Sequence, residues 1–208
     1  MKKTFIAVLA AAVMLGCFHA TAQESKASSA EPKQYMRVSN KIKPISSTLS
    51  IDLPFSFDDP FVSEEMPEDM KNWISSSKRC QADLEGLTMF ITCVQFTPDY
   101  IKNYITGNED EAMMNYLQGS MVERMKEMET KGQISAFSHR IMDIRPAGSK
   151  DKSLLLKGRY RESPQDFEVW VLQVLHKKEI WQVLFFFDPK NLPMQDAVEA
   201  ACFSAVIK

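Results

Sequence analysis

The sequence has little of the material from which catalytic and metal centres are usually built. Its 208 residues include 3 histidines and 4 cysteines, and no two cysteines form a Cys-x-x-Cys motif. His19 belongs to the N-terminal segment, which leaves only His139 and His176 for the rest of the chain. A histidine-based metal site or a serine triad therefore has few residues to draw on, and we expect no cofactor.

Strong charge of either sign is also lacking. The formal net charge is −2 and the isoelectric point is near 6.0, whereas nucleic-acid binding needs a concentrated basic face. We expect no nucleic-acid partner. No hydrophobic run beyond the N-terminal segment is long enough to span a bilayer, so attachment to a membrane would have to go through a lipid on Cys17.

Residues 1–22 have the pattern of a secretory signal peptide. Lys2 and Lys3 precede an apolar run over residues 5–18, which is shorter than the roughly 20 residues of a membrane span. Small and polar residues follow this run. The protein is therefore expected to leave the cytoplasm and to be periplasmic or secreted.

Two processing routes fit the end of this segment. Ala20-Thr21-Ala22 satisfies the small-x-small rule of signal peptidase, with the mature chain starting at Gln23. Met14-Leu15-Gly16-Cys17 instead resembles a bacterial lipobox, in which Cys17 is lipidated, although Leu15 stands where a small residue is usual. We favour cleavage after Ala22 and keep a membrane-anchored lipoprotein as the alternative.

The remaining chain predicts a flexible segment over 23–47 and a single domain over 48–208. The first part is rich in Ser, Ala, Lys and Glu and has few large apolar residues, so it cannot offset its ordering entropy. The second is long enough for one sizeable core.

The clearest pattern is an antiparallel meander of three strands, over residues 153–161, 167–176 and 180–187. The strands are rich in Val, Leu, Trp and Phe, and polar turn residues separate them. Both faces of the middle strand are apolar, so both must be covered. The fold class is therefore α+β: an antiparallel sheet of about six to seven strands, with a long Met-rich helix and a C-terminal helix packed on it.

Other strands are expected before and beside the meander. Alternation over 48–57 predicts a strand, placed at a sheet edge because Pro54 lacks an amide proton. Residues 64–74 are expected to form a short helix, and residues 134–144 another strand. Pro193 is expected to open the terminal helix.

A hairpin is predicted over 77–84 and 87–96, turning at Glu85-Gly86. A loop centred between Gly86 and Leu87 would place Cys80 opposite Cys93, within reach of a disulfide in an oxidising compartment. The alternative is two buried free thiols. Cys202 is expected to be a small core residue of the terminal helix.

Asn108 and three following acidic residues predict the start of the long helix, which Gly132 ends. Its inner face is rich in methionine, including Met121, Met125 and Met128. Thioethers bind Cu(I), so a metal site is one hypothesis, with Met113, Met114 or Cys93 as further ligands. We favour the other interpretation, that these methionines are core residues, because no histidine is near them in sequence.

Two polar groupings remain. His139, Asp143 and Arg145 share one face of the strand over 134–144, but His139 and Asp143 lie roughly 13 Å apart on a strand, too far for a direct acid–base pair. The basic residues of the first meander strand suit an acidic ligand or, more commonly, a charged solvent face; they are Lys157, Arg159 and Arg161.

The expected order is strand, short helix, hairpin, long helix, four strands and terminal helix. Three stretches mark it: Ile51-Asp52-Leu53-Pro54-Phe55-Ser56-Phe57, Trp181-Gln182-Val183-Leu184-Phe185-Phe186-Phe187 leading into Asp188-Pro189, and the amphipathic end over 200–207. With the hairpin before the acid-capped helix, they resemble the PsbP-like and Mog-like fold, which includes DcrB-like small bacterial envelope proteins. The resemblance implies a non-catalytic binding or assembly role and carries no site residue across.

The leading hypothesis is therefore a secreted cell-envelope protein that binds an unknown envelope protein or small ligand. The first alternative is a small enzyme resembling NTF2-like proteins, which would need a deep pocket containing His139 or Asp143. The second is Cu(I) handling by Met121, Met125 and Met128.

Overall fold

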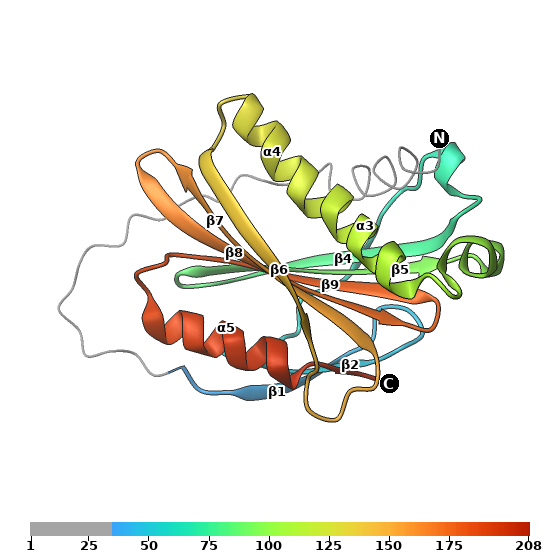
Figure 1. Cartoon of the computed structure of the whole chain (residues 1–208). Coiled ribbons are helices and arrows are strands. Elements are labelled where there is room, and N and C mark those ends of the chain that lie inside the picture. The colour runs from blue at the N-terminus through green and yellow to red at the C-terminus, as the bar shows by residue number, and fades with distance from the viewer. Residues whose placement is uncertain (1–34) are drawn as a thin grey trace.

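The computed structural model describes residues 35–208 (Figure 1). The signal-peptide prediction, both processing routes and Cys17 lie outside the described residues. Within them, a long antiparallel sheet separates two layers, and each layer packs its own hydrophobic core against one face of the sheet.

The main sheet has seven strands in the order β3-β4-β5-β9-β8-β7-β6, all antiparallel to their neighbours. This confirms the predicted α+β class and the meander. The strands are β3 Val62–Ser63, β4 Ile74–Leu84, β5 Leu87–Phe96, β6 Ser135–Ile144, β7 Lys152–Glu162, β8 Gln165–His176 and β9 Glu179–Phe187.

The helical layer covers one face with a single long rod, interrupted by one wider turn. Helix α3 (Glu109–Leu117) continues through a π-helical turn, η3 (Gln118–Val122), into α4 (Glu123–Thr130). Its buried side chains include Met113, Met121 and Met125, which are at most 1 % exposed. Figure 1 shows this rod lying obliquely across the strands.

A buried polar row crosses the sheet beneath this rod. Thr92, Gln182 and Gln173 face one another on β5, β9 and β8. The Gln182 amide donates to Ser120 Oγ at 2.9 Å and to Gln173 Oε1 at 2.8 Å, and Gln173 donates to the carbonyl of Met113 at 2.7 Å. Buried amides need such partners, so the row fixes where the rod sits on the sheet.

The opposite face is covered by α5 (Leu192–Ser204) and by a second, three-stranded sheet. That sheet has the order β1-β2-β10, with β1 Val38–Ile42, β2 Leu49–Leu53 and β10 Val206–Ile207. The core between the layers contains Trp170, Trp181 and Phe185. Both faces of the central strands are thus covered, as their apolar alternation predicted.

Three sequence predictions are corrected by the elements before β4. Strand β1 lies inside the range 23–47 expected to be flexible and pairs with β2, which supplies the hydrogen bonds that its own composition did not reveal. Strand β2 is the centre of its sheet and not an edge, because Pro54 falls just beyond its last paired residue. Residues 64–74 hold only a short 3-10 turn, η1 (Glu68–Met70), because Ile74 already starts β4.

The β4–β5 hairpin turns at Glu85-Gly86 as predicted, but its register differs. Leu84 pairs with Leu87, which places Cys80 opposite Ile91 and Cys93 opposite Lys78. The turn is a tight two-residue loop, with Gly86 at φ 81°, so the strands are shifted by two residues from the expected pairing. The two cysteines lie diagonally and are free, which corrects the predicted disulfide.

Candidate functional site

The basic face predicted on the first meander strand is neutralised by its neighbours. Arg159 bonds Glu168 at 2.7 Å and Arg161 bonds Asp166 at 2.8 Å. Lys157 bonds Glu199 at 2.8 Å and lies 3.5 Å from the centre of the Trp170 ring. These pairs leave little unbalanced charge for an acidic ligand.

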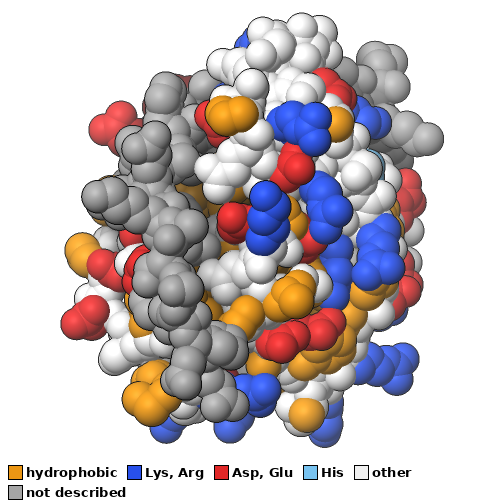
Figure 2. All heavy atoms as spheres, turned by 90° about the vertical axis from the view of Figure 1, so that its left-hand side faces the viewer, with side chains coloured by type: hydrophobic (Ala, Val, Ile, Leu, Met, Phe, Trp, Pro, Cys, Tyr) orange, Lys and Arg blue, Asp and Glu red, His pale blue; other side chains and the backbone are white. Residues whose placement is uncertain are grey.

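Figure 2 looks onto the end of the molecule where the β7–β8 hairpin turns, and there Lys and Arg side chains lie among Asp and Glu. Alternating signs of this kind are typical of a solvated surface.

A different group of lysines lines an open pocket at the turn between β8 and β9. The pocket has a volume of ≈ 460 Å³ and is formed by Pro98, Ile101, Lys102, Thr106, Lys177 and Lys178. The first four come from α2 (Pro98–Tyr100), from the π-helical turn η2 (Ile101–Ile105) and from the residue after it. The last two are the turn itself, because β8 ends at His176 and β9 begins at Glu179.

The three lysines of this lysine pocket differ from those of β7 in their partners. Among the described residues, no carboxylate lies within ion-pair distance of Lys102, Lys177 or Lys178. Two acidic residues are adjacent in sequence to the lining, Asp99 after Pro98 and Glu179 after Lys178. Three positive charges beside the apolar side chains of Pro98 and Ile101 favour a ligand that is anionic and partly apolar.

The turn that carries Lys177 and Lys178 is strained. Lys177 has φ 53°, in the left-handed region that favours glycine. Two-residue hairpin turns usually place Asn or Gly at such a position. The amide of Phe96 donates to the carbonyl of Lys178 at 2.9 Å, which ties the turn to the end of β5. A strained turn persists only where the surroundings hold it.

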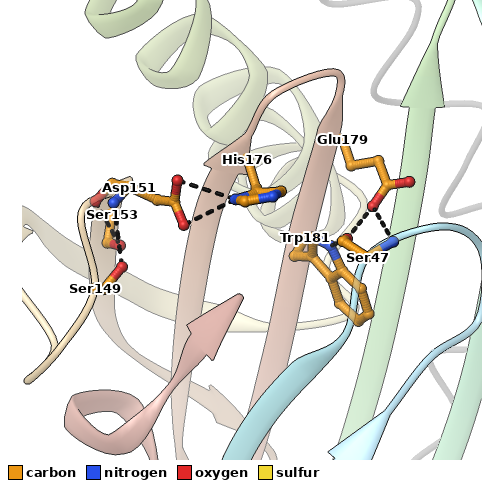
Figure 3. A network of polar contacts seen from close by, with 7 residues as sticks. All are labelled: Ser47, Ser149, Asp151, Ser153, His176, Glu179 and Trp181. Atoms are coloured by element: carbon orange, nitrogen blue, oxygen red, sulfur yellow. Dashed lines mark hydrogen bonds and ion pairs between the residues drawn. The ribbon is translucent and has the colours of Figure 1, made fainter. Parts of the chain in front are cut away.

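On one side the turn is held by Glu179, which is only 2 % exposed. Its carboxylate accepts hydrogen bonds from the hydroxyls and backbone amides of Ser46 and Ser47, and from the Gln95 amide at 3.0 Å. Trp181 Nε1 in turn donates to Ser47 Oγ at 3.0 Å (Figure 3). The network anchors the β1–β2 connection to the sheet beside the lysine pocket.

The same network decides the charge of Glu179. Burial alone would raise the pKa of its carboxyl, but the hydrogen bonds from Ser46, Ser47 and Gln95 outweigh burial and hold the pKa below its ordinary value. Glu179 is therefore an anion at neutral pH, stabilised by neutral donors.

On the other side the turn is held by His176. Its Nδ1 lies 3.0 Å from both carboxylate oxygens of Asp151, which precedes β7 (Figure 3). The amide of Asp151 bonds Ser149 Oγ at 3.2 Å, so the carboxylate is itself positioned. The His176 side chain is 12 % exposed, and its Nε2 is buried without a hydrogen-bond partner. A ring nitrogen closed off in this way suits a structural clamp better than a proton-transfer group.

A ladder of aromatic rings continues from the pocket segment to the surface. Tyr100 lies with its ring centre 5.0 Å from Phe96, 5.1 Å from Tyr104 and 6.4 Å from Trp73. Tyr104 is 50 % exposed. The segment that contributes Ile101 and Lys102 to the pocket therefore also presents an aromatic side chain to solvent.

The cysteines predicted as a disulfide are buried and unreactive. Burial is the main cause that raises the pKa of the Cys80 thiol to about 12. Burial and the nearby Glu179 carboxylate also raise the pKa of Cys93, whose Sγ lies 3.9 Å from Glu179 Oε2. Cys202 is fully buried in the core under α5, which confirms its predicted place. None of the three has the lowered pKa of a nucleophile.

The methionines of the copper hypothesis lie in the core between the helical rod and the sheet. Met121, Met125 and Met128 are all buried there among apolar side chains. Cys93, named as a further ligand, packs into the core on the other face of the sheet. The geometry therefore does not bring Cys93 to the methionines.

The residues of the enzyme hypothesis lie on the exposed edge strand β6. His139 stacks on Phe137 at 5.2 Å between ring centres, and neither His139 nor Asp143 lines the lysine pocket. Over residues 35–208 no three His, Cys, Asp or Glu residues are grouped to hold a metal ion.

Sequence reasoning missed the residues that build the pocket. Lys177, Lys178 and Glu179 were predicted only as turn residues, and Ser46 and Asp151 carried no recognisable pattern. Contacts such as Glu179 to Ser46 join residues 133 positions apart. The signal available in the sequence was an acid directly after a dipeptide of lysines.

Among the described residues no helix is both long enough and apolar enough to cross a membrane.

Neither a protein-family model nor a curated protein matches the sequence. Among solved structures, the chain is similar to a Pseudomonas aeruginosa protein of unknown function, PA94, described as a putative regulator, with 12 % identity and a TM-score of 0.36 over 69 % of this chain and 94 % of that chain. It is also similar to LpqN, involved in cell envelope biogenesis of Mycobacterium tuberculosis, with 11 % identity and a TM-score of 0.45 over 83 % of this chain and 91 % of that one. Likenesses at this level assign neither a family nor a function.

Proposed function

We propose that the protein is a non-catalytic binding module of the cell envelope that takes an anionic ligand in the lysine pocket. The observation that carries this function is the contrast in pairing. Lys102, Lys177 and Lys178 share one open pocket without an ion partner among the described residues, whereas the basic residues of β7 are paired. A protein retains unbalanced charge in a concave site at a cost in self-repulsion, which a bound anion would relieve.

Rigid support around the pocket is consistent with binding. His176 and Glu179, the residues on either side of the two lysines, are each held by a polar network. A preorganised turn loses less entropy when a ligand binds. The envelope location rests on the sequence alone, on the pattern of residues 1–22, and the resemblance to PsbP-like and Mog-like proteins remains a prediction beside it.

The binding function is tested by calorimetric titration of the processed protein with inorganic phosphate at low ionic strength. We expect saturable binding that weakens as salt is added, because screening reduces charge attraction. The variant Lys177→Gly/Lys178→Ser keeps turn-forming residues but removes two charges, and should lose most of the binding.

The matched control is Lys41→Thr/Lys126→Gln, which removes two charges from exposed positions on β1 and α4. It should bind phosphate as the unchanged protein does. Absence of saturable binding, or an equal loss in both double variants, would overturn the proposed function.

A further inference from the structure

We propose that the anion bound at the lysine pocket is the phosphodiester headgroup of an anionic phospholipid, so that this end of the molecule docks on a membrane surface. The inference rests on the proposed function and specifies its ligand. This membrane contact would not depend on the alternative processing route, in which Cys17 carries a lipid.

The types of residue in the pocket favour a phosphoryl group. All of its basic side chains are lysines, which act as compact point charges with rotatable donors. Lysine binds phosphate as a point charge, and no arginine, whose fork pairs with carboxylates and phosphates alike, lines the pocket. The lining lysines come from two separate elements, η2 and the β8–β9 turn, and tetrahedrally arranged phosphate oxygens can accept from donors on more than one side.

The apolar part of the lining favours a headgroup that is attached to hydrocarbon. Pro98 and Ile101 stand among the lysines and would be left against water by a bare inorganic ion. A volume of ≈ 460 Å³ suits a headgroup and the first carbons of its chains, with the open side of the pocket facing the bilayer.

An exposed aromatic side chain lies on the same short segment. Tyr104 is half-exposed, follows Lys102 by two positions and is backed by Tyr100. Tyrosine is favoured where an apolar ring can enter the membrane interface while its hydroxyl stays in water. The pocket residues Pro98, Ile101 and Lys102 share one face of this helical segment, whereas Tyr100 and Tyr104 lie on another, so the tyrosine is an exposed neighbour of the pocket and does not line it.

The experiment is co-sedimentation of the processed protein, recovered from the cell envelope, with vesicles of phosphatidylglycerol mixed into phosphatidylcholine. Pure phosphatidylcholine vesicles serve as the reference, and the readout is the ratio of the two partition constants. Any anchoring by the N-terminal segment contributes to both and cancels. We expect a ratio well above one that falls steeply with salt.

Lys177→Gly/Lys178→Ser should lower this ratio about thirty-fold, since each lysine at an anionic surface contributes roughly a five-fold preference. Lys41→Thr/Lys126→Gln should leave the ratio within about two-fold of the unchanged protein if the contact is confined to the lysine pocket.

Two results separate this inference from the proposed function. A protein that binds inorganic phosphate or glycerol phosphate but partitions equally to both kinds of vesicle would overturn the lipid assignment and leave the anion site standing. A protein that binds neither phosphate nor the anionic vesicles would overturn both. Equal losses in the two double variants would show general charge attraction and would also overturn the lipid site.

Discussion

Two regions of the molecule each contain three basic side chains, but those of one region are paired with carboxylates and those of the other are not. On β7, Lys157, Arg159 and Arg161 each meet a carboxylate from β8 or α5. At the β8–β9 turn, Lys177 and Lys178 join Lys102 with no such partner among residues 35–208. We infer from this contrast that a group of basic side chains is available to bind an anion only where no carboxylate of the protein pairs with it.

The carboxylates that are close to the lysine turn are committed elsewhere. Glu179 is bound by serine and glutamine donors, and Asp151 is bound by His176. On β8, Glu168 accepts from Arg159 of β7 and from the Trp170 indole, each at 2.7 Å. The two regions therefore differ in which partners their neighbouring carboxylates bind. Substitutions of those carboxylates test this difference.

The largest effect is expected from Glu179→Ala. Loss of the carboxylate leaves the buried Ser47, the half-buried Gln95, and Ser46 without their acceptor, which should lower the free energy of unfolding by about 3 kcal/mol. Phosphate affinity should fall as well, because the turn loses its anchor. Urea unfolding measures the first effect, with Glu162→Ala on the exposed end of β7 as the control. A loss below about 1 kcal/mol would show that the network does not hold the turn.

Acidification should reproduce part of this loss. Because hydrogen bonding holds the pKa of Glu179 below its ordinary value of 4.5, its contribution to stability is complete above that value and is lost as the pH falls through the lowered pKa. The free energy of unfolding, measured from neutral to strongly acidic pH, should therefore decline more steeply for the unchanged protein than for Glu179→Gln. Parallel curves would contradict the assignment of a lowered pKa to this residue.

Glu168→Gln removes the ion partner of Arg159 on β7, and so tests whether one unpaired basic side chain is enough to bind phosphate. The glutamine oxygen can still accept from the Trp170 indole, so the cost should be about 1 kcal/mol. Phosphate affinity should not change, because an unpaired arginine on an open strand has no converging partners. Unfolding and calorimetric titration of the same variant test both statements. Stronger phosphate binding by this variant would mean that an unpaired charge alone is sufficient.

The smallest effect is expected from Lys177→Gly. Glycine adopts the left-handed backbone at φ 53° without strain, so the variant should be more stable by about 0.5 kcal/mol. Lys178→Gly is the matched control, because Lys178 does not have a positive φ, and it should be less stable by roughly 0.5 to 1 kcal/mol. Thermal unfolding of the pair checks the sign. A destabilised Lys177→Gly would show that the lysine side chain, and not the turn, stabilises this end.

Much of the fold followed from hydrophobic periodicity. The alternation in β7, β8 and β9 predicted the meander, and the acid-capped stretch with spaced methionines predicted the rod α3–η3–α4. The wider π turn at η3 left no trace in that pattern, because its buried Gly119 and Ser120 continue the inner face. The register of the β4–β5 hairpin was harder to predict, because moving the turn by one residue decides whether Cys80 lies opposite Cys93 or opposite Ile91.

The candidate site could not be predicted from the sequence, because only the fold brings its residues together. Lys177 and Lys178 look like ordinary turn residues, and the segment that contributes Ile101 and Lys102 lies more than seventy positions earlier in the chain. The β1–β2 connection, which supplies Ser46 and Ser47, was expected to be flexible. Long-range polar contacts of this kind have no period that a sequence pattern can reveal.

The most direct test of the difference between the two basic regions is a backbone amide NMR titration of the processed protein with inorganic phosphate. The account predicts that the shifted resonances gather at Ile101, Lys102, Thr106, Lys177 and Lys178 and that those of β7 stay in place. Shifts centred on Arg159 and Arg161, or scattered evenly over all surface lysines, would contradict it.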